Sequence, residues 1–231
     1  MAKPIIIPLN TTPEQSAKLR ALQLVFSQVC NTLAPVVRDT RCWNRVALHH
    51  MTYRDLRAKF PQLGSQMVCN AIYSVSRTSR LLFQSPGSPF NIARLGAKPL
   101  PLMQFAPTAP VYFDRHTLSI KEGHLSMFTM DGRMRFELGL SPDNERRFHD
   151  EKLQEIVLSS RSDRFSLKFE LMPVGEEAGL LAQTAAQTSA RSGSEPEAPI
   201  PLNRASPQRN PALPDYLVVL PSPAPLTGDT P

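Results

Sequence analysis

Three arginines that follow the first apolar segment are the clearest candidates for chemistry in this sequence. Arg38, Arg41 and Arg45 lie close together, and Trp43 stands between the last two. Guanidinium groups contact phosphate oxygens, and an indole ring stacks on a nucleobase or against an arginine. This combination is typical of a surface that binds nucleic acid. The alternative is a solvated surface with Trp43 packed in the core.

Further basic residues follow on two later segments. Arg77 and Arg80 lie three apart on a predicted helix, so their side chains are neighbours. An ordinary helix exterior is the alternative for each residue taken singly. The predicted nucleic-acid-binding set is Arg38, Arg41, Trp43, Arg45, Arg54, Arg57, Arg77 and Arg80.

No pattern in the sequence indicates a metal site, a cofactor or a catalytic centre. Adjacent residues on a helix point about 100° apart, so His49 and His50 do not form a metal-binding pair by themselves. The three cysteines have no CxxC spacing and indicate free thiols in a reducing compartment. The carboxylates between Asp143 and Glu151 alternate with basic residues, which predicts a solvated, salt-bridged loop.

The charge of the chain is uneven along its length. The whole chain carries a net charge of +6, but the segment from Pro173 onward is acidic. A basic body attracts polyanions, and binding to phosphates releases counterions. The N-terminus lacks the long apolar stretch of a signal peptide, and no apolar run is long enough to span a membrane. We therefore expect a cytoplasmic protein.

The first elements are a short strand and a long helix. Ile5–Leu9 is rich in β-branched residues, and its flanking prolines favour a position at a sheet edge. Thr12 is the expected helix N-cap, followed by Pro13 and by Gln15 in a capping box. Apolar residues then recur at helical spacing up to Val36. Pro35 is expected to kink or end this helix.

Two further helices and a proline-rich link are expected next. Thr52 is expected to cap a helix that stops at Pro61, and Gly64 opens another that runs to Phe83. The latter has an apolar face and a polar face that carries Ser74, Ser76, Arg77 and Arg80. Gln84–Pro110 contains six prolines, which indicates an extended connection.

The stretch from Val111 to Leu171 has strand character, with turn signals that include Asp131–Gly132. We expect an antiparallel barrel that the Ile5–Leu9 strand joins. Pro173–Pro231 is rich in proline, alanine and serine, which predicts disorder. One apolar island in it, Tyr216–Leu220, is a candidate for docking on a partner.

The predicted fold is therefore α+β. Residues 1–110 form a strand, a helical module and a link, residues 111–172 form the barrel, and residues 173–231 form a disordered tail.

Several segments share their order with one known family. They are Ile5–Leu9 followed by Pro13 and Gln15, Asn31 in the first helix, Leu63–Gln66 followed by Leu81–Phe83, Gly87–Phe90, Thr117–Leu125, and the Ile156–Leu171 hairpin. This order resembles the N-terminal half of TnpB-type RNA-guided nucleases, which are transposon-associated, and of their miniature type V CRISPR relatives. The resemblance covers residues 4–172. It implies a recognition module joined to a wedge domain.

The sequence departs from that family where the nuclease begins. In the family, a strand with a catalytic aspartate in a G-I-D-x-G context follows the wedge hairpin, but here Met172–Glu177 follows. There is also no zinc ribbon of paired CxxC motifs. We therefore expect a non-enzymatic protein that binds structured RNA or an RNA–DNA duplex, as a truncated or split TnpB-like protein. A separately encoded nuclease subunit is a candidate partner.

Two alternatives stay open. The helix from Gln66 to Phe83 offers Gln66, Asn70, Arg77 and Arg80 as reading residues for a duplex-DNA-binding regulator. An interaction protein that docks through Tyr216–Leu220, with incidental basic charge, is the second alternative.

Overall fold

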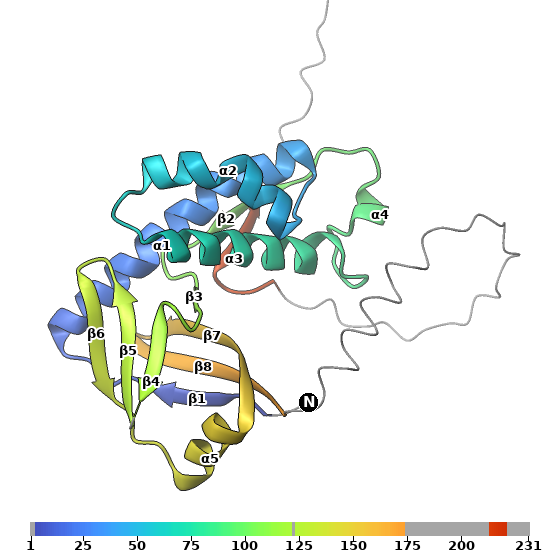
Figure 1. Cartoon of the computed structure of the whole chain (residues 1–231). Coiled ribbons are helices and arrows are strands. Elements are labelled where there is room, and N and C mark those ends of the chain that lie inside the picture. Colours follow the sequence, from blue (N-terminus) through green and yellow to red (C-terminus); the bar gives the residue numbers. More distant parts are fainter. Residues whose placement is uncertain (1–2, 122, 174–212, 221–231) are drawn as a thin grey trace, which may run out of the picture.

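The computed structural model describes residues 3–121, 123–173 and 213–220, and these residues fold as α+β (Figure 1). The helices are α1 (Pro13–Thr40), α2 (Arg45–Lys59), α3 (Ser65–Phe83), α4 (Ile92–Leu95) and α5 (Pro142–Asp150). The strands are β1 (Ile5–Pro8), β2 (Leu102–Phe105), β3 (Val111–Phe113), β4 (Leu118–Lys121), β5 (His124–Thr129), β6 (Gly132–Glu137), β7 (Glu151–Arg161), β8 (Arg164–Pro173) and β9 (Leu217–Leu220).

Helix α1 begins as its sequence predicts. The Thr12 hydroxyl accepts a hydrogen bond from the Gln15 N–H, and the Gln15 side chain accepts one from the Thr12 N–H, which completes the capping box. Pro35 is expected to kink or end this helix. The expected end at Pro35 is wrong, because α1 continues to Thr40. Val37 lies beyond the proline and is completely buried, so apolar packing favours continuation of the helix.

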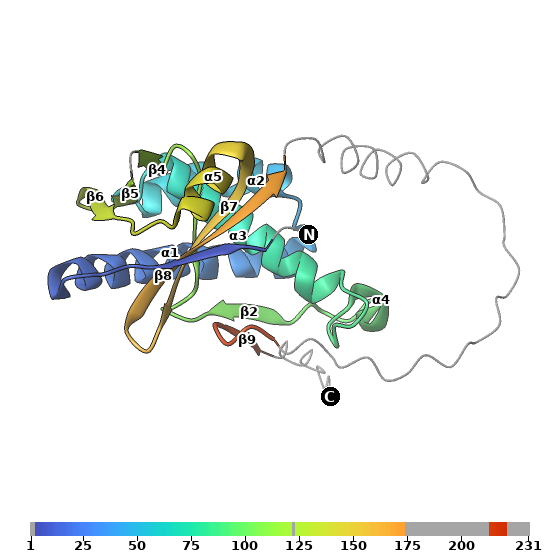
Figure 2. The ribbon, with the colours of Figure 1, turned by 90° about the horizontal axis from the view of Figure 1, so that it is seen from below.

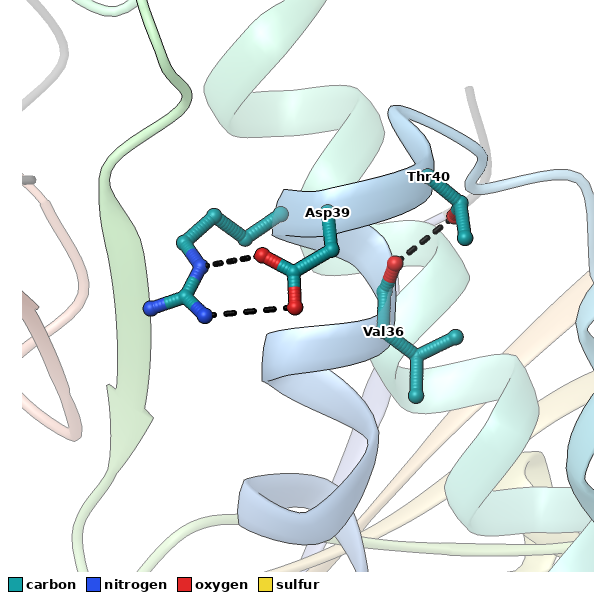
Figure 3. Close-up of polar contacts among 4 residues, drawn as sticks. Val36, Asp39 and Thr40 are labelled. Carbon is teal, nitrogen blue, oxygen red and sulfur yellow. Dashed lines mark hydrogen bonds and ion pairs between the residues drawn. The ribbon is translucent and has the colours of Figure 1, made fainter.

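The end of α1 is closed by local polar contacts. The Thr40 hydroxyl donates to the Val36 carbonyl at 2.7 Å, and on the same last turn the Asp39 carboxylate accepts two hydrogen bonds from the Arg38 guanidinium (Figure 3). Arg41 then adopts a left-handed conformation with φ 52°, which stops the helix.

Helix α2 starts earlier than the sequence predicts. Asn44 is its N-cap, and the Asn44 side chain accepts hydrogen bonds from the N–H groups of Val46 and Ala47. Thr52, the expected cap, lies inside the helix, where its hydroxyl donates to the Leu48 carbonyl. The stretch 39–50, which has no clear sequence signal, therefore contains the end of α1, a short loop and the start of α2.

Helix α3 lies between α1, α2 and strand β3. Its predicted apolar face is buried, from Met67 to Leu82. The prediction that Ser74 and Ser76 belong to an exposed face is wrong, because both are buried. The Ser76 hydroxyl donates to the Trp43 carbonyl at 2.6 Å, so the loop before α2 covers this side of the helix.

The described strands form three antiparallel sheets, with strand orders β1-β8-β7-β3, β2-β9 and β4-β5-β6. Strand β1 joins β8, with Ile5 opposite Phe169. The expected closed barrel is not found among these strands. The two edge strands of the four-stranded sheet are short, and Pro4, Pro8 and Pro110 flank them without a backbone N–H to extend pairing. One continuous apolar core joins the sheets and the helices.

Two segments differ from their sequence expectations. The acidic and basic stretch after Ser141 is a helix, α5, and not a loop, with the Ser141 hydroxyl accepting from the Asn144 N–H. Tyr216–Leu220 contains strand β9, which pairs with β2 of the same chain (Figure 2). The remainder of the expected disordered tail, residues 174–212 and 221–231, lies outside the described residues.

Candidate nucleic-acid interface

The helical module and the four-stranded sheet are joined by a cluster of aromatic and charged side chains. Glu155 on β7 is 8 % exposed and accepts a hydrogen bond from the Tyr73 hydroxyl at 2.7 Å. The Arg77 Nε lies 3.2 Å from the same carboxylate oxygen. Tyr112 on β3 packs edge-on against Tyr73, with ring centres 5.5 Å apart. The cluster fixes α3 against β3 and β7.

A β-bulge places Glu155 in this cluster. The pairing register between β7 and β8 shifts between Leu153 and Glu155, which inserts one extra residue into β7. A bulge re-aims the side chains that follow it. Burial and the hydrogen bond to Glu155 raise the pKa of Tyr73 to about 12, so the phenol stays protonated and keeps donating.

Two cavities adjoin at Gln66, which lines both of them. The first, of about 320 Å³, lies between α2 and α3. The second, of about 510 Å³, lies between α3, the β3–β4 turn and β7. We call the two together the basic groove, and its polar lining residues are Arg45, His49, Gln66, Asp114, Arg115, His116, Lys152 and Gln154.

The charges that line the basic groove are mostly positive. Arg45, Arg115 and Lys152 contribute three cations from three different elements. The acid in the lining, Asp114, accepts hydrogen bonds from the Gln66 amide at 2.5 Å and from the Thr117 hydroxyl at 2.9 Å. Its negative charge is therefore partly offset by one donor from α3 and one from its own turn.

Aromatic rings lie beside these cations. The Arg45 guanidinium carbon lies 5.3 Å from the centre of the Tyr73 ring, which is a cation–π distance. The His49 and Tyr53 rings are stacked one helical turn apart, with centres at 4.6 Å and planes at 19°. Cations interleaved with aromatic rings are the side chains that bind the backbone and bases of nucleic acids.

The structure places most of the predicted site residues in contacts within the chain. Arg38 pairs with Asp39 through two hydrogen bonds, and Arg41 donates to the carbonyls of Gly96 and Lys98. The Trp43 ring is partly buried and lies 5.5 Å from the Phe83 ring, so it packs against the edge of the core. Arg41 and Trp43 therefore tie the loop after α1 to neighbouring segments, whereas the Arg38 pair stays within the last turn of α1.

The other predicted residues do not form one strip. Arg57 donates to the Leu63 carbonyl, and Arg77 belongs to the Glu155 cluster. Arg54 is exposed, but it lies half a turn away from Arg45 around α2. Arg80 is exposed and lies 3.5 Å from the Ser76 hydroxyl. Of the predicted set, only Arg45 lines the basic groove.

Sequence reasoning missed the other groove residues because they come from separate elements. Arg115 lies in the β3–β4 turn and Lys152 at the start of β7. Lys152 follows the mixed-charge stretch Asp143–Glu151, whose pattern indicates a solvated loop, and only the folded chain brings these cations to the same groove as Arg45. The local feature that marks Arg115 and Lys152 is an exposed cation next to a turn or at the end of a strand.

A larger cavity, with a volume of about 810 Å³, lies elsewhere in the described structure. The β1–α1 loop and the β7–β8 turn line it. Its cations are Arg20 and Arg164, and Arg20 is paired with Asp163 at 3.0 Å. Because Asp163 offsets the charge of Arg20, this cavity is a weaker candidate for a phosphate than the basic groove.

Comparisons with known proteins add nothing to this geometry. No family model matches the chain, and no curated protein is significantly similar to it in sequence. Within the described residues, no group of histidine, cysteine or carboxylate side chains could hold a metal ion. The helices in the described ranges include none with the length and apolarity that crossing a membrane requires.

Proposed function

We propose that this chain is a non-catalytic nucleic-acid-binding protein that holds structured RNA or an RNA–DNA duplex in the basic groove. The observation that carries the proposal is that Arg45 lines the cavity between α2 and α3 while Arg115 and Lys152 line the cavity at the sheet that adjoins it at Gln66. The protein would recognise the nucleic acid there through contacts to its phosphates and through the shape of its double helix. A cytoplasmic location and the reducing compartment inferred from the free cysteines belong to the same proposal.

The resemblance to TnpB-type proteins supplies the proposed context. Its recognition and wedge modules correspond here to the helices α1–α3 and to the sheets below them. The proposed lack of catalysis rests on the sequence, in which Met172–Glu177 replaces the aspartate motif of that family. A separately encoded nuclease subunit is the proposed protein partner.

The packing of α3 disfavours the duplex-DNA regulator. Asn70, one of its candidate reading residues, is 5 % exposed and bonded to Met67 and Thr117. Arg77, another, is paired with Glu155. A helix packed in this way does not present the reading face that a major groove requires. The interaction-module alternative loses its main support, because Tyr216–Leu220 pairs with β2 of the same chain.

The test measures binding of fluorescein-labelled RNA, DNA and RNA–DNA duplexes by fluorescence anisotropy over a series of salt concentrations. The variant Arg45→Ala/Arg115→Ala/Lys152→Ala should weaken binding about tenfold or more and lower the slope of log K against log salt by about 2 to 3, because each lost phosphate contact removes about one unit.

A matched control removes the same charge away from the groove. Arg54, Arg161 and Arg164 are exposed and lie outside both cavities, so their triple alanine variant should keep the wild-type slope within about one unit. Circular dichroism checks that both variants fold. A wild-type protein that binds none of the duplexes at low salt would overturn the proposal, as would a groove variant that binds like the control.

A further inference from the structure

The three-stranded sheet β4-β5-β6 has one face turned into the core and one face that carries polar and basic side chains. Leu125, Met127 and Met134 point inward and are buried. Arg133 and Arg135 alternate with them on β6 and are exposed. By the pairing register, Ser126 lies opposite Arg135 and Ser119 lies opposite Ser126, so these three residues form one row across the sheet.

This outer face is continuous with the basic groove. The Arg133 guanidinium donates to the carbonyl of His116 at 3.3 Å, and His116 lines the groove. On the same side of the row, Phe128 lies opposite Arg133 on the neighbouring strand, and a Cβ atom placed on Gly64 would lie 3.2 Å from the Phe128 ring, so the sheet also touches the start of α3. Figure 1 shows the three strands below the connection between α2 and α3.

Arg133 and Arg135 have different roles on this face. Arg133 braces the sheet, because it donates to the hydroxyl and the carbonyl of Ser126 and lies 3.3 Å from the Ser119 hydroxyl. Arg135 makes no hydrogen bond or ion pair with any other described residue, and its charge faces solvent. A surface with one immobilised cation and one unpaired cation attracts a row of phosphates. Binding to the immobilised cation costs little side-chain conformational entropy.

Among the described residues of this face, negative charge is confined to one edge. Glu137 follows Arg135 at the end of β6, and its carboxylate lies 3.9 Å from the His124 ring. The row that contains Ser119, Ser126 and Arg135 itself carries no acid. Charge complementarity therefore favours an anionic occupant next to the groove.

We propose that the outer face of β4-β5-β6 is a second phosphate-binding surface for the same nucleic acid, so that the site takes a double helix in preference to a single strand. One strand lies in the basic groove, and the phosphates of the other strand lie over Arg135. Proteins that recognise an A-form helix by shape contact the phosphates of both strands in this way. The inference rests on the function proposed for the groove.

The experiment compares two RNA probes of the same sequence, one single-stranded and one as a duplex, with wild-type protein and the variant Arg135→Glu. The variant should bind the duplex about tenfold more weakly, because it exchanges an attraction for a repulsion, and should bind the single strand as wild type does. The control Arg54→Glu, on the far side of α2, should change duplex binding less than about threefold.

The outcomes separate the two proposals. If the groove triple variant weakens binding of both probes but Arg135→Glu weakens neither, the groove stands and the second surface is wrong. Equal weakening of both probes by Arg135→Glu would also overturn the preference for a duplex. If wild-type protein binds neither RNA, the proposed function fails and this inference fails with it. Arg135 is exposed, and thermal melting confirms that its variant stays folded.

Discussion

Asn31 and Phe105, which are 74 residues apart in the chain, exchange two hydrogen bonds. The Asn31 amide donates to the Phe105 carbonyl at 2.9 Å, and the Phe105 N–H donates to the Asn31 carbonyl oxygen at 2.7 Å. One side chain of α1 thereby satisfies the edge of β2 that faces away from β9, as a neighbouring strand would. The link attaches the two-stranded sheet to the helical module.

The first prediction concerns this link. Asn31→Ala should lower the free energy of unfolding by about 2 kcal/mol, because it leaves a backbone N–H and C=O without their partner. Urea denaturation followed by circular dichroism measures the change. Gln28→Ala on the same helix is the control, since Gln28 is exposed and its side chain makes no hydrogen bond to a described residue. A loss for Asn31→Ala no larger than for the control would contradict the role assigned to the asparagine.

The second prediction separates a structural role from a binding role for Arg77. Arg77→Met leaves the buried Glu155 carboxylate with Tyr73 but without its cation. The free energy of unfolding should fall by about 2 kcal/mol, a value below that of a fully buried pair because the Arg77 side chain is 37 % exposed.

Nucleic-acid binding by Arg77→Met should keep the wild-type salt slope within about one unit, since the guanidinium is committed to Glu155. Arg80→Met serves as the matched variant, because Arg80 lies one turn further along α3 and is exposed. If Arg77→Met were as stable as Arg80→Met and bound nucleic acid more weakly, Arg77 would be a phosphate contact after all.

Local sequence signals predicted many of the elements. The capping box at Thr12 and the Asp131–Gly132 turn act over a few residues, and the structure confirms both the helix and the hairpin. The apolar pattern does not predict the start of α2, because only Leu48, Thr52 and Leu56 of that helix are buried, which leaves a weak apolar period. The signal that marks the start is the Asn44 cap, eight residues before Thr52.

The candidate site was harder to predict because its residues are partnered across long sequence distances. The spacing of Arg41, Arg57 and Arg77 indicates exposed cations, yet each one contacts a group that only the fold brings near. Glu155 reaches Arg77 through a β-bulge, which no periodicity reveals. The groove forms where α2, α3, a turn and β7 meet, so its charge density is a property of the tertiary structure.

The third prediction concerns thiol reactivity. Cys30 is completely buried, and burial raises the pKa of its thiol to about 12, so almost no thiolate is present near neutral pH. Cys42 and Cys69 are partly exposed. Iodoacetamide should modify these two in the native protein and all three in urea, as peptide mass spectrometry would show. Alkylation of Cys30 as fast as Cys42 under native conditions would contradict the packing of α1 against α3.

The fourth prediction is a loss of stability in alkali. The pKa of Tyr73 is about 12 in the folded protein, against an ordinary value of 10.0, through burial and the bond to Glu155. Burial raises the pKa of Tyr112 as well. Between these pH values the unfolded chain loses phenolic protons that the folded chain keeps, so unfolding releases protons. The stabilisation is complete below pH 10 and is lost as the pH rises towards 12.

Urea denaturation at a series of pH values from about 8 to 11 measures this slope. Tyr73→Phe keeps the ring contact with Tyr112 and removes the ionisable hydroxyl, so its stability should fall less steeply with pH than that of wild type. Tyr53→Phe, which changes a tyrosine outside the Glu155 cluster, should keep the wild-type slope. Equal slopes for wild type and Tyr73→Phe would show that the Tyr73 hydroxyl is not held by the Glu155 carboxylate, and that α3 is joined to β7 by other contacts.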